Sequence, residues 1–280
     1  MRAHAVVVAI AVSLVAAPQA QQPSLKDVLY KMGNGLGVLR GFQEEDSLMT
    51  VEYWGTGTMR ELGPKTVGAP VDVKSYHAAV AYDFPGMRVM ITRAGSAQPE
   101  IQVVSGTFAW NEMDKVGGGL VPGHGSATPV MDVVADRLLR LWTTPFGVYK
   151  AAVAAGDKTK VSMEGGKVVL TFPLTNAAAG PTSYLVVGEL NGTPVKVTLD
   201  AESRPEQVEV RHRNRVLTTT YSGYGDLNEK DLKADIFFPA RIVQTADGQG
   251  VLDLRIEKTN TYNPYVLMPV PENVQKAGAR

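Results

Sequence analysis

Residues 128–156, TPVMDVVADRLLRLWTTPFGVYKAAVAAG, are the only long helical segment in a chain whose other segments mostly alternate in twos. Thr128-Pro129 and Thr144-Pro145 each match a helix start, because the threonine hydroxyl accepts a hydrogen bond from a free backbone N–H and proline needs no N–H at the first helical position. The segment therefore predicts two linked amphipathic helices, which need one large apolar surface to cover.

The apolar positions of this segment recur at helical spacing, and charged residues fall on the opposite side. We expect residues 129–155 to form a helical lid whose apolar stripe faces a sheet. The first helix contributes Val130, Met131, Val134, Leu138, Leu141 and Trp142 to the stripe, and the second contributes Phe146, Tyr149 and Val153. The opposite side of the first helix carries Asp132, Asp136 and Arg140.

Alternating segments joined by short turns flank the helices on both sides and predict about a dozen strands. Asn191-Gly192 is the strongest hairpin signal, because both residues accept positive φ. The fold class predicted is α+β, with one large, curved antiparallel sheet, an unclosed half-barrel, and the helices packed on its concave face. The predicted strands are residues 47–57, 71–84, 87–92, 101–110, 158–163, 167–174, 183–190, 193–200, 207–212, 216–221, 236–245 and 251–259.

The N-terminus is typical of a secretory signal peptide. A short basic start precedes an apolar run over residues 5–17, which is too short to span a bilayer comfortably. We predict a signal peptide over residues 1–20 and a periplasmic or secreted mature protein without a transmembrane anchor. The chain has no cysteine, which excludes disulfides, thiolate metal sites and the lipidated cysteine of a bacterial lipoprotein.

The remaining chain is predicted to form one domain and a tail. Residues 21–262 should be a single β-rich half-barrel domain, which begins with a short helix after Ser24 that frays near its three glycines. Residues 263–280 contain three prolines, so they cannot continue a sheet and predict a C-terminal tail or linker.

The charge balance argues against nucleic acid as a partner. Lys plus Arg and Asp plus Glu number 28 each, so no basic excess is available to neutralise phosphates. Arg211, Arg213 and Arg215 form a short basic cluster at a predicted hairpin. Such charges usually keep a sheet edge soluble, and contact with an acidic partner is the alternative.

No catalytic constellation emerges from the sequence. Zinc hydrolysis needs three protein ligands and an open position, whereas the histidines are scattered. We interpret His77 and His212 as packed or surface side chains, and the acidic groups at residues 44–46 and 229–235 as solvating turns. We therefore expect a protein that is not an enzyme and has no metal site and no cofactor. The four histidines are His4, His77, His124 and His212, of which His124 lies between two glycines.

Three motifs resemble a known family: TTPFG at residues 143–147, FFPARIV at residues 237–243 and VPENV at residues 270–274. Over most of its length the chain resembles the β-rich region ahead of the metallo-β-lactamase-fold domain in some secreted bacterial metallohydrolases. The HxHxDH motif of that catalytic domain is absent here, so its zinc site is not carried over. This resemblance implies an accessory or scaffolding domain that docks to a partner enzyme.

The predicted architecture is also similar to the periplasmic lipoprotein-carrier superfamily, in which helices cover an unclosed half-barrel over an apolar cavity. This similarity implies a non-catalytic carrier for a lipid, a hydrophobic small molecule or the acyl chains of a lipoprotein. The glycine-rich residues 115–126 would then be the hinge of the lid. The same aromatic and aliphatic residues also fit a filled core, so cavity and core both remain open at this stage. The candidate ligand contacts are Trp110, Leu138, Trp142, Phe146 and Tyr149.

Overall fold

A 13-stranded antiparallel sheet organises the chain in the computed structural model, which describes residues 23–43, 45–60, 68–112, 126–178, 184–185 and 187–279. The predicted signal peptide, His124 and nearly all of the predicted hinge lie outside these residues. In spatial order the strands are β8 (Ala127–Pro129), β7 (Phe108–Glu112), β6 (Glu100–Ser105), β5 (Gly86–Arg93), β4 (Val71–Ala81), β3 (Thr50–Met59), β17 (Gln249–Asn260), β16 (Phe238–Ala246), β15 (Arg215–Gly225), β14 (Pro205–His212), β13 (Pro194–Leu199), β10 (Lys167–Pro173) and β9 (Lys160–Glu164).

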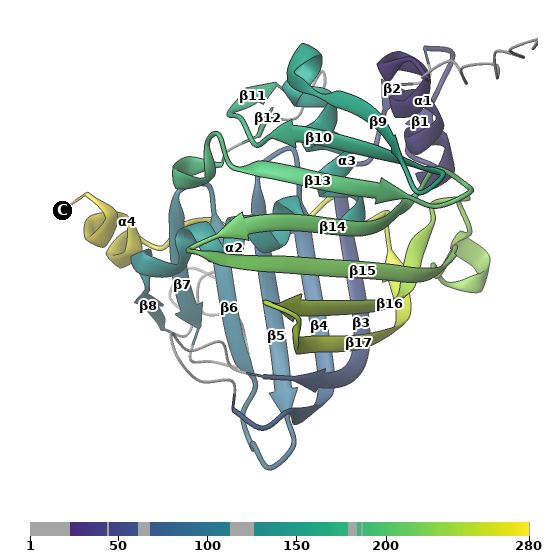
Figure 1. Cartoon of the computed structure of the whole chain (residues 1–280). Helices are drawn as coiled ribbons and strands as arrows, with labels where there is room; N and C mark the ends of the chain where they lie inside the picture. Colours follow the sequence, from purple (N-terminus) through teal and green to yellow (C-terminus); the bar gives the residue numbers. More distant parts are fainter. Residues whose placement is uncertain are drawn as a thin grey trace, which may run out of the picture.

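The sheet bends so strongly that its two halves cross in Figure 1, with β3 to β7 behind β13 to β17. The halves meet where β3 pairs with β17, from Met59 opposite Leu252 to Glu52 opposite Asn260. The order of strands ends at β8 on one side and β9 on the other, so the described sheet is open. This arrangement confirms the predicted α+β half-barrel.

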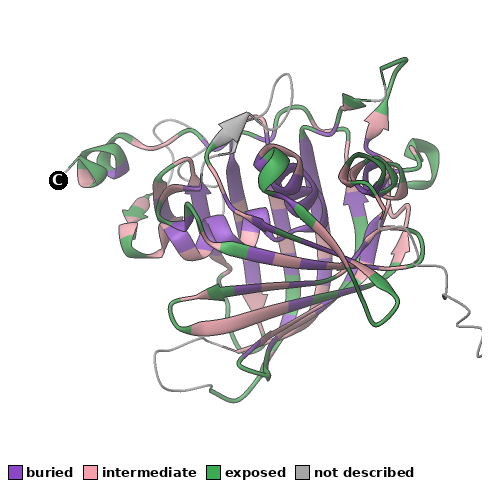
Figure 2. Cartoon of the chain, turned by 45° about the horizontal axis from the view of Figure 1, so that its top comes forward, coloured by how far each residue is buried: buried purple, intermediate pink, exposed green. Residues whose placement is uncertain are grey.

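Two helices lie on the concave side, between the two halves of the sheet (Figures 1 and 2). They are α2 (Val134–Trp142) and α3 (Pro145–Ala155), and α1 (Leu25–Leu36) packs against α3. The remaining elements are β1 (Leu39–Arg40), β2 (Glu45–Asp46), η1 (Met131–Val133), η2 (Gly156–Lys158), β11 (Ala177–Ala178), β12 (Tyr184–Leu185), η3 (Gly188–Leu190), η4 (Lys230–Leu232) and α4 (Glu272–Gly278).

The buried apolar residues form two clusters on opposite faces of the sheet. The main core joins α1, α2 and α3 to the concave face, which appears as the purple interior in Figure 2. The second cluster lies on the convex face, under the C-terminal segment that the sequence predicted only as a tail. Its buried members are Ala81, Ile101, Val103, Trp110, Val266, Met268 and Val274.

Several predicted helix and hairpin starts are confirmed. Ser24 caps α1 through its side chain, which accepts a hydrogen bond from the Asp27 N–H, and Thr144 caps α3 with Pro145 in its first turn. Strands β14 and β15 form the hairpin predicted for residues 207–212 and 216–221, and its turn lies at Arg213 and Asn214, which both have positive φ.

Three local predictions are wrong, two because strand pairing outweighs a local signal and one because a turn at a glycine divides the predicted strand. Thr128 and Pro129 belong to β8, which pairs with β7, so α2 begins only at Val134. Residues 101–110 form two strands, because Gly106 has a φ of 54° and turns the chain between β6 and β7. Asn191-Gly192 joins no hairpin, since β13 pairs with β10 and β14.

The predicted fraying of the first helix is also wrong. The helix α1 continues through Gly33 and Gly35 to Leu36. A Cβ at residue 33 would lie 2.8 Å from the Leu39 Cγ, and one at residue 35 would lie 2.4 Å from the Glu202 carbonyl oxygen. These glycines therefore allow close packing against α1, which offsets their low helix propensity.

Candidate functional site

A cavity of about 710 Å³ opens on the concave side, between α2 and the inner faces of both halves of the sheet. Its apolar wall comes mainly from β14, β15 and β17, where alternate side chains point inward. Its polar wall comes from α2, β5 and β6. The residues lining it are Met59, Arg60, Tyr76, Arg93, Glu100, Gln102, Val133, Asp136, Arg137, Leu139, Arg140, Thr143, Val208, Val210, His212, Arg213, Arg215, Leu217, Thr219, Gln244, Val251 and Leu252.

Positive charge predominates among the described residues that line this cavity. Six of them are arginines and two are carboxylates, Glu100 and Asp136, so the excess is four positive charges with His212 neutral. The whole chain has a formal net charge of +0. The fold therefore concentrates cations on the concave side, although the composition shows no basic excess.

One polar chain runs from β5 through β6 to α2 along the cavity wall. Arg93 donates to one oxygen of Glu100 at 3.0 Å, and the Gln102 amide donates to the other. The Gln102 side-chain oxygen in turn accepts a hydrogen bond from Arg140 at 3.1 Å. Glu100 is therefore engaged by two other donors, and Arg140 is bonded to a neutral amide.

Arg137 anchors α2 to the sheet beside Arg140. Its guanidinium donates to the carbonyl oxygens of Val103 at 2.7 Å and Trp110 at 2.6 Å, and its side chain is buried. Burial, together with the adjacent charge of Arg140, lowers the pKa of Arg137 to about 10. The charge of Arg140 and the loss of hydration therefore both act against the positive charge of Arg137.

The rim of the cavity is held by contacts between α2 and the hairpin of β14 and β15. His212 Nε2 lies 2.8 Å from Asp136 Oδ1, and Arg213 Nη1 lies 3.1 Å from Asp136 Oδ2. Arg213 also donates to the Asp132 carbonyl oxygen at 2.7 Å. These contacts join two segments that are about 76 positions apart in the chain.

The cavity continues into a small inner recess of about 40 Å³. Arg140, Thr143 and Leu252 are among the residues that line both spaces. The inner end is apolar and aromatic, with Tyr53 and Tyr221 among its walls. Burial raises the pKa of both tyrosines, so their hydroxyl groups stay protonated at neutral pH, and Tyr221 donates to the Thr143 carbonyl oxygen.

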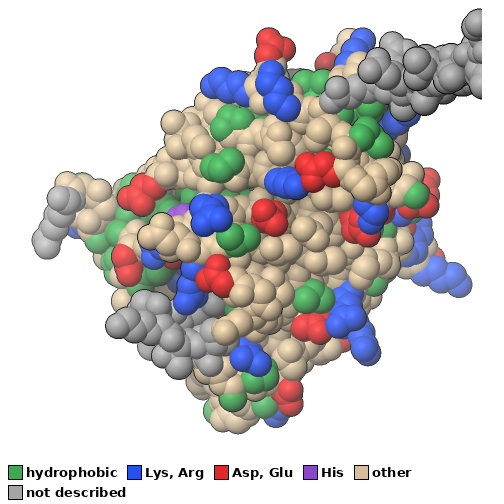
Figure 3. All heavy atoms as spheres, viewed as in Figure 1, with side chains coloured by type: hydrophobic (Ala, Val, Ile, Leu, Met, Phe, Trp, Pro, Cys, Tyr) green, Lys and Arg blue, Asp and Glu red, His purple; other side chains and the backbone are tan. Residues whose placement is uncertain are grey.

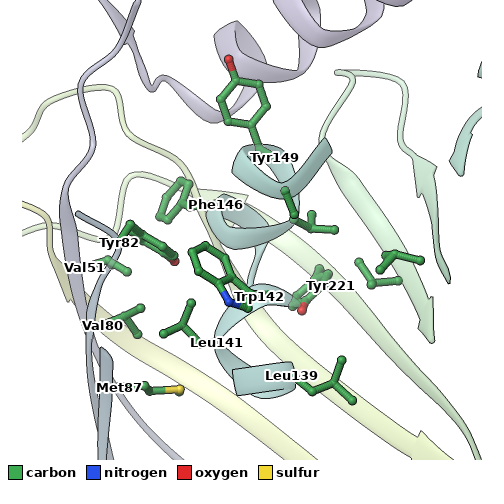
Figure 4. Close-up of a cluster of buried hydrophobic side chains, with 14 of the residues drawn as sticks. Val51, Val80, Tyr82, Met87, Leu139, Leu141, Trp142, Phe146, Tyr149 and Tyr221 are labelled. Atoms are coloured by element: carbon green, nitrogen blue, oxygen red, sulfur yellow. The ribbon is translucent and has the colours of Figure 1, made fainter. Parts of the chain in front are cut away.

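Four of the five predicted ligand contacts lie together in the main core. Figure 4 shows Trp142 and Phe146 facing Tyr82, with Leu141 and Tyr221 nearby. Leu138, Trp142 and Phe146 are 0% exposed and Tyr149 is 5% exposed. None of the four lines the 710 Å³ cavity. Their role in ligand contact stays a prediction.

The fifth predicted contact, Trp110, lies on the other side of the sheet. It belongs to the convex cluster with Met268 and Val274, and its indole N–H donates to Glu112 at 3.3 Å. Strand alternation explains the separation, because Trp110 shares its face with its cross-strand partner Val103 and not with the inward-facing Asn111.

The α3 part of the predicted lid is an interior element. Its residues are apolar nearly all round, and the described structure covers it with α1, α2, β10 and the short pair β11 and β12. Within residues 129–155, the cavity is lined by residues of η1, α2 and the turn after it, Val133 to Thr143.

Two charged groups that the sequence predicts to face solvent line the cavity instead. Asp136 and Arg140 belong to the predicted charged side of the first helix, and Arg213 and Arg215 belong to the basic cluster at the predicted hairpin. Both groups line the cavity. The prediction of turn-solvating acids is also corrected at Asp46, which forms an ion pair with Lys150, while Glu44 lies outside the described residues.

His77, which the sequence singled out, lies outside the cavity. It pairs with Glu52 at 3.1 Å and stacks on Trp54 with ring centroids 4.4 Å apart. The hydrogen bond from His77 lowers the pKa of Glu52. Within the described ranges, no group of three or more His, Cys, Asp or Glu side chains is placed to hold a metal ion.

The outer surface carries basic and acidic side chains interspersed with apolar ones (Figure 3). On the face shown, no large area has a single sign of charge. No helix among the described residues is long and apolar enough to cross a membrane.

Comparison with known proteins found similarity to solved structures but none at the level of sequence families. No protein-family model and no curated sequence matches the chain. A crystal structure of a LolA superfamily protein from Nitrosomonas europaea is similar at 13% identity and a TM-score of 0.47, covering 90% of this chain and 97% of that one. The fold described above rests on the strand pairing itself. The resemblance to the region ahead of metallo-β-lactamase-fold domains stays a prediction.

Proposed function

We propose that the protein is a non-catalytic binding protein that holds a lipid or another amphipathic small molecule in the concave cavity. The observation that carries the proposal is the 710 Å³ cavity itself. Its volume falls within the range of about 300–1,000 Å³ that is typical of small-molecule sites. Residues 1–20, predicted as a signal peptide, would place this activity in the periplasm or outside the cell.

The two walls of the cavity support an amphipathic ligand over a purely apolar or purely polar one. Val208, Val210 and Leu217 offer an apolar surface on adjacent strands, and burial of apolar ligand area against them is favourable by about 25 cal/mol per Å². The opposite wall offers guanidinium and amide donors, which a hydrocarbon alone would leave without partners. A ligand with an apolar chain and a polar head satisfies both walls.

Filling the cavity should abolish binding. Leu217 points inward from β15, and its neighbour Thr218 points outward on the same strand. We expect Leu217→Trp to weaken binding of a fluorescent fatty-acid probe by about tenfold or more, because the larger side chain overpacks the site. Thr218→Trp is the matched control and should bind as the wild type does. Titration of the probe into both purified variants measures the difference.

Two outcomes would overturn the proposal. Wild-type protein that binds neither the probe nor any lipid recovered in native mass spectrometry has no such activity, and docking to a partner enzyme then becomes the better hypothesis. Equal binding by the wild type and Leu217→Trp, with both variants folded, would place the ligand elsewhere than in this cavity.

A further inference from the structure

Arg140 occupies a special position in the concave cavity. It lies in the last turn of α2 and lines both the main space and the aromatic inner recess. It therefore stands where the polar wall meets the apolar interior. A ligand that extends along the apolar wall of β14 and β15 would present its head group to this guanidinium.

The charge of Arg140 is not neutralised by a carboxylate within the described residues. Its hydrogen-bond partner is the side-chain oxygen of Gln102, at 3.1 Å. The nearest acid in that polar chain, Glu100, already accepts from Arg93 and from Gln102. The guanidinium has five N–H donors in a planar fork, so most of its hydrogen-bonding capacity remains for a ligand.

The second guanidinium beside Arg140, that of Arg137, adds electrostatic repulsion at this site. Arg137 donates hydrogen bonds to the carbonyl oxygens of Val103 and Trp110 and to the side-chain oxygen of Asn111, and none of these acceptors is charged. Burial is the main cause that lowers the pKa of Arg137, and repulsion from the charge of Arg140 adds to it, while the carboxylates of Glu100, Asp132 and Asp136 act in the opposite direction. An anion at Arg140 would relieve this repulsion as well as form charge-assisted hydrogen bonds.

We infer that the ligand carries an anionic head group, a carboxylate or a phosphate, and that Arg140 with Gln102 is its receptor. The inference rests on the proposed function and names the chemical class of its ligand. The single apolar chain of the ligand lies along Val208, Val210 and Leu217. A fatty acid and a single-chain phospholipid share this chemistry and differ in the head group.

Three probes with the same apolar chain test the inference: dodecanoate, dodecyl phosphate and dodecanol. Hydrogen bonds to charged groups contribute about 1.5–3 kcal/mol, so we expect at least one anionic probe to bind wild-type protein about 10- to 100-fold more tightly than dodecanol. Calorimetric titration of each probe measures the ratio. Preference for dodecanoate indicates a fatty acid, and preference for dodecyl phosphate indicates a phospholipid.

The variant Arg140→Gln should remove this preference, so that the three probes bind with similar affinities. Arg211→Gln is the matched control, because it removes the same charge from a residue on the exposed outer face of β14. It should keep the wild-type ratio. We expect Arg140→Gln to melt at or above the wild-type temperature, because it removes one of two repelling cations. Arg140→Lys, which keeps the charge without the planar fork, should retain an intermediate preference.

The outcomes separate the inference from the proposed function. Equal binding of all three probes by the wild type, or an unchanged ratio in a folded Arg140→Gln variant, overturns the inference and leaves an amphipathic binding site in place. Failure of every probe to bind wild-type protein overturns both.

Discussion

Lys150 is a buried cation within the main core, on α3. Its side chain is 2% exposed and forms an ion pair with Asp46, and its Nζ lies 5.3 Å from the centre of the Tyr82 ring. Burial lowers the pKa of Lys150, and the charge of Asp46 opposes that shift. The pair joins α3 to the short strand β2, which links the interior helix to the segment after α1.

Breaking this pair from one side should destabilise the protein strongly. We expect Asp46→Asn to lower the free energy of unfolding by about 3–5 kcal/mol, because it leaves a buried ammonium without a counter-ion. Adding Lys150→Met to that variant should restore most of the loss, since the remaining pair is uncharged. Urea unfolding of the wild type and both variants at neutral pH measures the effect.

The double variant serves as the control for loss of packing alone. If Asp46→Asn unfolds at the wild-type urea concentration, the ammonium is neutralised by another route and the ion pair makes no net contribution. If the double variant is no more stable than Asp46→Asn, the cost lies in packing and not in the unpaired charge.

At the scale of an element, the start of α3 shows what makes Thr144-Pro145 a helix start, whereas Thr128-Pro129 belongs to the strand β8. The Thr144 hydroxyl accepts from the Gly147 N–H at 3.1 Å and donates to the Leu141 carbonyl oxygen at 2.7 Å, so it joins the end of α2 to α3. A Cβ at residue 147 would lie 2.4 Å from that same carbonyl oxygen. The tight junction therefore needs both the cap and the glycine.

Removing the cap should cost measurable stability without changing the fold. We expect Thr144→Ala to lower the free energy of unfolding by about 1–2 kcal/mol, in the upper range for a cap because the hydroxyl is buried and has further partners. Thr144→Ser keeps the hydroxyl and should retain most of the stability. Denaturant midpoints of the two variants provide the comparison, and equal midpoints would show that the hydroxyl does not contribute.

At the scale of the whole molecule, the sheet is covered on both faces. On the concave face α2 and α3 pack beside the 710 Å³ cavity, and part of the convex face is covered by the C-terminal segment. There Val274 of α4 is 0% exposed, the Asn273 amide donates to the Ala127 carbonyl oxygen at 2.6 Å, and Trp110 lies in the same cluster. The last strand in the chain order, β17, lies at the centre of the sheet, so the C-terminal segment returns across the first half of the sheet.

A charge in this convex cluster should release the C-terminal segment. We expect Val274→Asp to lower the free energy of unfolding by about 2–4 kcal/mol or to undock α4, because a buried carboxylate without a partner is costly. Trp110 would then become accessible, and acrylamide quenching of tryptophan fluorescence would increase. Gln275→Asp places the same charge on the exposed side of α4 and should behave as the wild type.

Loss of the segment should leave the concave cavity intact, since the two clusters lie on opposite faces. A Val274→Asp variant that remains folded should therefore bind the fluorescent probe with unchanged affinity. A parallel loss of binding would show that the two faces are coupled through the sheet. Unchanged quenching would show that α4 does not protect Trp110.

The sequence predicted correctly those features that depend only on residues close together in the chain. Period-two alternation and turn residues such as Arg213 and Asn214 predicted most of the strands and the antiparallel order, and Thr144-Pro145 predicted the start of α3. These features depend on backbone conformation and on hydrogen bonds within a few residues. The half-barrel with interior helices follows from them, because a curved sheet and apolar helices must cover each other.

The sequence by itself thus determined the strands, the helix pair and the α+β architecture, and it determined which residues are apolar. Only the tertiary structure decided which face each strand turns inward, and so placed Trp110 on the convex side, away from Trp142. It also assembled the cavity, because Arg93, Arg140 and Arg213 meet from segments far apart in the chain. The physical reason is that local patterns set backbone conformation, whereas the position of a charge or a ring relative to a distant segment depends on the closure of the whole sheet.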